Sequence, residues 1–93
     1  MIPPWPFEDS CNTAAITTQQ VLEGAPILRV AHDADDGSWQ FLCGTTDETS
    51  DGRVVGLGEL CDRDPSLLEL ADLPEGRHAW RERPGAPWRR GPA

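Results

Sequence analysis

Hydrophobic and polar residues alternate most regularly between residues 26 and 44. The segments 26–32 (PILRVAH) and 38–43 (SWQFLC) both show the two-residue period of a half-buried β-strand. The loop between them ends in the dipeptide Asp36-Gly37, which is typical of tight hairpin turns. The pattern predicts an antiparallel hairpin, with Trp39 and Phe41 on the buried face of its second strand.

Weaker patterns predict further strands on both sides of this hairpin. Residues 13–17 and 53–55 are short and apolar enough for brief strands, and residues 77–83 predict a last one. Residues 57–61 (LGELC) either continue the second of these strands or begin a helical turn.

Two segments have the start and stop signals of short helices. Residues 17–24 (TTQQVLEG) combine a threonine N-cap, good helix formers and a closing glycine. In residues 64–71 (DPSLLELA), Asp64 is a natural N-cap and Pro65 suits the first helical position, while the leucines provide an apolar side.

Together these elements predict one small α+β domain, with a mainly antiparallel sheet of about four strands and one or two short helices. The domain spans residues 11–83. Residues 1–10 form an extended N-terminal arm because they contain three prolines, and residues 84–93 form a C-terminal segment rich in Pro, Arg and Trp. The predicted core consists of Ile27, Val30, Trp39, Phe41, Leu42, Val54, Leu57, Leu67 and Leu70.

Composition narrows the possible functions. The chain has 93 residues and a net charge of −8, which argues against generic binding to nucleic acid or to membrane surfaces. No apolar run approaches the length of a membrane-spanning helix. The first nine residues lack the basic and apolar parts of a secretory signal, so a cytoplasmic location is expected.

The aspartates at 33, 35 and 36 raise the question of a metal site. A calcium loop that starts at Asp33 would place Gly37 at its fifth position and Gly44 at its twelfth, where oxygen ligands are required. The two histidines, His32 and His78, lie in predicted strands without a neighbouring ligand. We therefore expect a hairpin tip at the aspartates, and neither a metal nor another cofactor.

Nucleophile motifs are also missing from the sequence. No serine lies in a G-x-S-x-G turn, and the spacing of the three cysteines fits neither a C-x-x-C pair nor a zinc site. Cys43 and Cys61 are expected to be small buried apolar residues, and the sequence leaves open whether they or Cys11 react. These observations predict a protein that is not an enzyme.

One concentrated feature is the stretch WRERPGAPWRR at residues 80–90. Trp and Arg are the residue types most enriched at the energetic centres of protein interfaces, and alternating aromatics and arginines also bind nucleic acid. Alternatively, Trp80 packs in the core and the arginines pair with the acidic body, since residues 8–75 carry a balance of −12 and residues 77–93 one of +4. The predicted partner-binding residues are Trp80, Arg81, Arg83, Trp88, Arg89 and Arg90.

Two family resemblances bear on function. The chain resembles a class of short bacterial proteins of unknown function. The residues that carry this resemblance are 36–44 (DGSWQFLCG) and 64–81 (DPSLLELADLPEGRHAWR), together with the shorter "PI" at 26–27, "VV" with "L" at 54–57 and "PW" at 87–88. Trp39, Phe41 and Gly44 resemble the W-x-F-x-x-G strand of a domain-of-unknown-function family found among immunity proteins of bacterial polymorphic toxin systems. The second resemblance implies binding to a toxin.

The sequence therefore predicts a small bacterial, non-catalytic protein-interaction module that binds a protein partner and neither nucleic acid nor membrane. One alternative is an immunity-type inhibitor of a bacterial toxin. Another is a small ligand-binding protein or hydrolase. An exposed apolar patch ringed by polar residues would favour the interaction module, whereas an enclosed pocket with converging polar groups would favour the enzyme.

Overall fold

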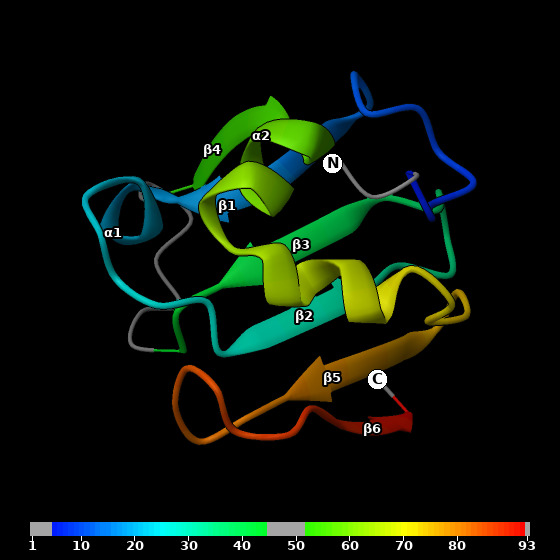
Figure 1. Cartoon of the computed structure of the whole chain (residues 1–93). Helices are drawn as coiled ribbons and strands as arrows, with labels where there is room; N and C mark the ends of the chain where they lie inside the picture. The colour runs from blue at the N-terminus through cyan, green and yellow to red at the C-terminus, as the bar shows by residue number, and fades with distance from the viewer. Residues whose placement is uncertain (1–4, 45–51, 93) are drawn as a thin grey trace.

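The computed structural model describes residues 5–44 and 52–92. Its centre is a six-stranded sheet with the order β4-β1-β3-β2-β5-β6 (Figure 1). Strands β1 and β3 run parallel, and each of the other neighbouring pairs is antiparallel. The strands are β1 (Ala14–Thr18), β2 (Arg29–His32), β3 (Trp39–Leu42), β4 (Gly52–Gly56), β5 (Arg77–Trp80) and β6 (Arg89–Pro92).

The α+β class is as predicted, but the sheet is larger and mixed. The central hairpin is confirmed, because β2 pairs with β3 in the register Val30 to Phe41 and Gly37 takes a positive φ of 73° in the connecting loop. The expected number of four strands is wrong. Strand β6 (RRGP) has no apolar alternation, since it is an edge strand in which Gly91 is the buried position.

The helices are short and begin where side chains can cap them. Helix α1 (Gln19–Leu22) has the Thr18 hydroxyl as its cap, which accepts a hydrogen bond from the Val21 amide at 3.3 Å. Residues 57–61 become helical in α2 (Leu57–Arg63). The predicted helix at 64–71 is a 3-10 helix, η2 (Pro65–Leu70), and its Asp64 cap accepts from the Ser66 amide at 3.1 Å.

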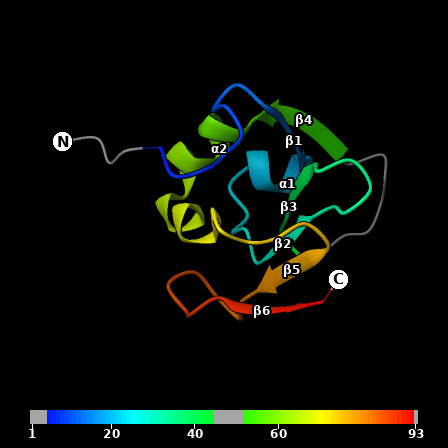
Figure 2. The same cartoon turned by 90° about the vertical axis from the view of Figure 1, so that its right-hand side faces the viewer.

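Helices α2 and η2 cover one face of the sheet, where the core lies (Figures 1 and 2). Burial of most predicted core residues is confirmed, including Trp39, Phe41 and the leucines of both helices. Two predictions are wrong: Leu42 is half-buried and Val54 is 71% exposed. Alternation along the strand explains both, because Leu42 and Val54 point to the face of the sheet that the helices leave open.

Both terminal segments pack on this body. Phe7 of the N-terminal arm is buried and meets the Trp39 ring edge-on, with the ring centroids 5.2 Å apart. At the other end of the chain, β6 extends the sheet beyond β5, and Trp88 packs against the core. The C-terminal segment is thus docked. Among the described residues, no helix is long and apolar enough to cross a membrane.

Candidate functional site: the open face of the sheet

The face of the sheet opposite the helices carries the strongest candidate for a functional surface. We call it the open face. Each strand contributes the side chains that alternate with its core-facing residues, and the cross-strand register places them next to one another. The larger side chains of the open face, with Ala31 between them, are Ile16, Arg29, Gln40, Leu42, Val54, His78, Trp80 and Arg89.

A row of Arg, Trp and Arg crosses this face. The register pairs Arg29 of β2 with Trp80 of β5, and pairs Trp80 with Arg89 of β6. The Trp80 ring lies over Gly91, where an added Cβ would come within 3.1 Å of it, and stacks on His78 with the ring centroids 4.8 Å apart. Glycine at position 91 therefore lets the indole lie flat across β6.

A small hollow lies beside this row. It has a volume of about 180 Å³ and is lined by Arg29, Val30, Ala31, Leu42 and His78. Its size suits a single side chain of a partner rather than a metabolite, for which pockets usually exceed about 300 Å³. Ala31 has the smallest side chain of these lining residues.

The far end of the open face is apolar. Ile16 of β1 pairs with Val54 of β4, and these side chains are 38% and 71% exposed. Burying such residues against a partner would be favourable at about 25 cal/mol per Å² of apolar area. The open face therefore combines an exposed apolar part with a cationic and aromatic part.

Charge separates this face from the rest of the molecule. None of the strand side chains that form it is a carboxylate, although the chain carries sixteen Asp and Glu residues. Within the described ranges, Arg29 and Arg89 lie beyond ion-pair distance of every carboxylate. Their guanidinium groups are thus available to an acidic partner.

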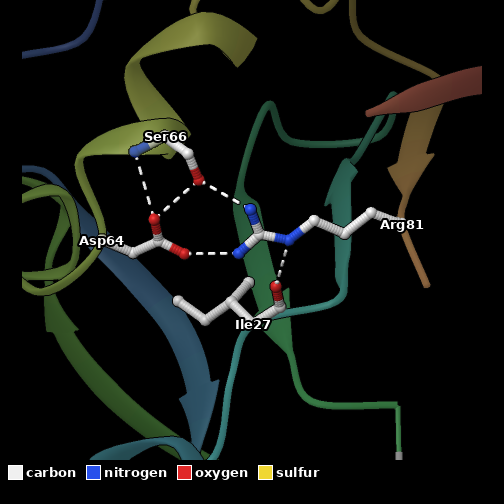
Figure 3. A network of polar contacts seen from close by, with 4 residues as sticks. All are labelled: Ile27, Asp64, Ser66 and Arg81. Atoms are coloured by element: carbon white, nitrogen blue, oxygen red, sulfur yellow. Dashed lines mark hydrogen bonds and ion pairs between the residues drawn. The ribbon is translucent and has the colours of Figure 1, made fainter. Parts of the chain in front are cut away.

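The predicted site residues Arg81 and Trp88 lie on the helix side of the sheet. The Arg81 side chain is 2% exposed and reaches from the end of β5 to the start of η2 (Figure 3). Its Nη2 donates to Asp64 Oδ2 at 2.6 Å, its Nη1 to Ser66 Oγ at 2.9 Å, and its Nε to the Ile27 carbonyl at 3.1 Å. Trp88 lies against this guanidinium, 4.2 Å from Cζ to the ring centroid.

The remaining predicted site residues lie apart from one another. Arg90 points to the helix side, where its Nη2 donates to Asp72 Oδ1 at 2.7 Å, and this hydrogen bond lowers the pKa of Asp72 below its ordinary value of 3.8. Arg83 is exposed in the turn before β6, near Glu82. Of the six predicted residues, Trp80 and Arg89 alone come together on the open face.

Larger hollows lie on the helix side of the described residues. The first, of about 500 Å³, opens between α1, the start of η2 and the turn that contains Pro84, and the Arg81 network forms part of its wall. In this network Ser66 Oγ also donates to Asp64 Oδ1 at 2.6 Å. The hydroxyl, the carboxylate and the guanidinium are thus engaged with one another, and they hold the fold together rather than converge on an empty site.

The second hollow, also of about 500 Å³, is acidic. Its carboxylates come from Glu8, Asp9, Asp36, Asp72 and Glu75, beside His32 and Trp39. Several already have partners: Asp9 accepts from Trp39 Nε1 at 2.8 Å, and Asp36 accepts from the Ser38 amide at 3.0 Å, which lowers the Asp36 pKa. His32 Nδ1 forms a hydrogen bond with the Leu73 carbonyl oxygen at 2.7 Å. In residues 5–44 and 52–92, no three His, Cys, Asp or Glu side chains are grouped as metal ligands would be.

The cysteines lie in different surroundings. Burial of Cys43 and Cys61 is confirmed, and Cys11 is exposed. Burial, helped by the nearby carboxylates of Asp62 and Asp64, raises the pKa of Cys61 to about 11. Cys61 is therefore a thiol at neutral pH, which is the unreactive form.

Sequence reasoning missed most of the open face. Arg29, Leu42 and His78 had been placed on strands, and their alternation with buried neighbours could have assigned them to one surface. What joins Arg29 to Trp80 is the pairing of β2 with β5, which are separated by more than forty residues of chain. No local pattern encodes that pairing.

Comparisons with protein-family models, with curated proteins and with solved structures found no match to this chain.

Proposed function

We propose that this protein is a non-catalytic interaction module that binds an acidic protein surface through its open face. The observation that carries the proposal is the row Arg29–Trp80–Arg89, set in register across three strands. Trp and Arg are the side chains that most often dominate binding energy when a partner covers them. Here they lie on a rigid sheet, so binding would cost little conformational entropy.

The chemistry of the partner follows from charge. Among the described residues, this surface has arginines without an ion-pair partner and no strand carboxylate. On a chain of net charge −8, it attracts carboxylates locally while the rest of the molecule repels them. A nucleic acid would present a continuous line of phosphates to the whole acidic body, which disfavours it. An acidic patch on a protein matches the limited size of the cationic row.

The apolar end of the face would supply the remaining contact. Val54 and Ile16 are exposed side chains at one end of the same surface, so a partner that covers both ends would bury apolar area and pair its carboxylates at once. The polar groups in the hollow beside Arg81 are hydrogen-bonded to one another. This arrangement supports binding rather than catalysis as the role of the protein.

The test is capture of partners from a cytoplasmic lysate of the source organism with three baits. These are the wild type, the variant Arg29→Glu/Arg89→Glu, and a control with the same charge change, Arg63→Glu/Arg77→Glu, at exposed positions outside the open face. We expect the wild type and the control to retain the same acidic protein, and the open-face variant to lose it. Because charged groups contribute to recognition, added salt should weaken capture.

Three results would contradict the proposal: capture that is unaffected by the open-face variant, equal loss with the control, or a captured partner that nuclease removes. Circular dichroism of all three baits checks that each is folded. If the captured protein is a toxin and its activity is suppressed, the module is an immunity-type inhibitor.

A further inference from the structure

We propose that the free edge of β4 pairs with β4 of a second copy of this chain, so that two sheets join into one. Strand β4 is the outermost strand at its end of the sheet, and no helix or strand of the described residues lies beyond it in Figure 2. An uncovered edge exposes unpaired backbone donors and acceptors, which are a template for another strand. This proposal concerns the edge of the sheet, whereas the open-face partner is proposed to bind its face.

The two edges of the sheet differ in how they are protected. The outer strand β6 contains two arginines and ends at Pro92, and charges and proline are common devices that prevent edge pairing. Strand β4 has the sequence GRVVG, with no proline and with exposed valine at its centre. Pairing is therefore blocked at the β6 edge and permitted at the β4 edge.

The register fixes which backbone groups of β4 face outward. The Leu57 amide donates to the Thr13 carbonyl at 2.8 Å, and these two residues are opposite in the register that continues from Ala14 and Gly56. In an antiparallel pair, hydrogen-bonded and non-hydrogen-bonded positions alternate. Val54 is then a non-hydrogen-bonded position toward β1, so its N–H and C=O point to the free edge.

This outward position makes β4 self-complementary. In an antiparallel pair with twofold symmetry at Val54, the two Val54 residues exchange reciprocal N–H···O=C bonds. Gly52 of each copy is then opposite Gly56 of the other, so no side chain obstructs the approach. Each Arg53 is opposite Val55 of the second copy, and the two arginines do not face each other.

Side chains on both faces of the joined sheet also match. On the open face, Ile16 and Val54 of one copy continue into Val54 and Ile16 of the other, which joins the apolar ends of the two open faces. On the helix side, the position opposite each Arg53 is Val55 of the other copy, so no like charges are opposed across the twofold axis.

The test is sedimentation velocity over a concentration series, together with amide hydrogen exchange. We expect a monomer–dimer equilibrium that shifts toward dimer as concentration rises. The Val54 amide should gain protection with concentration. The Arg53 and Val55 amides, which face β1, should be protected at every concentration. Because each copy carries a net charge of −8, added salt should strengthen the dimer, whereas it weakens capture of an acidic partner.

Two variants make the test specific. Val54→Lys places two like charges at the twofold centre and should abolish the dimer without unfolding the chain, since this side chain is 71% exposed. Val54→Thr keeps the branched side chain and should retain the dimer. A monomer at all concentrations, a dimer that survives Val54→Lys, or concentration-independent exchange at Val54 would overturn the proposal. These three results concern the dimer alone. They leave unchanged the test of the open-face partner, which depends on Arg29 and Arg89.

Discussion

At the scale of single residues, Arg81 joins three parts of the chain that are distant in sequence. Its guanidinium donates hydrogen bonds to the segment before β2, to the cap of η2 and to Ser66 within η2. It also lies against the Trp88 ring. A buried arginine with a fork of donors can satisfy several acceptors that a lysine cannot. The network therefore fixes the position of η2 relative to the sheet.

Replacing Arg81 tests this role. Arg81→Met should lower the free energy of unfolding by about 3–5 kcal/mol, because it leaves the half-buried Asp64 carboxylate without its partner. The double variant Arg81→Met/Asp64→Leu should recover part of this loss. Urea unfolding followed by tryptophan fluorescence measures both. A single variant as stable as the wild type would show that the network is dispensable.

The exposed pair of Arg90 and Asp72 gives a pH-dependent prediction. The hydrogen bond from Arg90 lowers the Asp72 pKa in the folded state, so this pair stabilises the fold above the unfolded-state pKa and ceases to do so as pH falls through the lowered value. In Arg90→Gln the Asp72 pKa should rise toward 3.8. Carbon-detected NMR titration of the carboxyl groups in the wild type and the variant measures it. An unchanged Asp72 value would mean that Arg90 does not contact it in solution.

At the scale of elements, β6 completes one edge of the sheet and its preceding turn brings Trp88 to the core. Exposed arginine–carboxylate pairs contribute only about 0–1 kcal/mol each, so apolar burial must provide most of the stabilisation of this segment. Trp88 packs on the core, and Trp80 lies over Gly91 of β6. The docked segment also shapes the open face, because Arg89 belongs to it.

Deleting residues 84–93 should therefore lower the thermal midpoint at both low and high salt. The deletion removes Trp88 from the core and uncovers the outer edge of β5. The single variant Trp88→Ala, which leaves β6 in place, should account for part of the loss. Truncating a fully buried aromatic costs about 3–5 kcal/mol, and the loss here should be smaller because Trp88 is partly buried. Differential scanning calorimetry compares the three proteins. An unmoved midpoint in the deletion variant would refute docking.

At the scale of the whole molecule, the charge is strongly unbalanced. Sixteen acidic residues face eight arginines, and the chain contains no lysine. Mutual repulsion of like charges opposes the compact state, and dissolved salt screens it within about 10 Å at 0.1 M. The open face is the part of the sheet where this negative charge is absent.

Adding sodium chloride at low protein concentration should thus raise the thermal midpoint of the intact chain. The variant Glu23→Gln/Glu69→Gln, which removes two exposed negative charges, should have a higher midpoint at low salt and a smaller response to salt. Calorimetric scans over a salt series measure both effects. If the midpoint falls with salt, attractive ion pairs outweigh the repulsion.

The sequence by itself determined the features that short-range physics controls. Alternation between residues 26 and 44 predicted the hairpin and the burial of Trp39 and Phe41, because side chains on a strand alternate between its faces. Asp64 and Pro65 marked the start of η2, since capping depends on the next few residues alone.

Tertiary structure alone decided the rest. The parallel pairing of β1 with β3 and the addition of β6 depend on contacts between distant segments, so no local pattern predicts them. Val54 and Leu42 are as apolar as core residues. They point away from the core because α2 and η2 pack on the opposite face of the sheet. The same choice of face separated Trp80 and Arg89 from Arg81 and Trp88, because neighbouring residues of an extended chain point to opposite sides. The candidate surface is therefore a property of the assembled sheet.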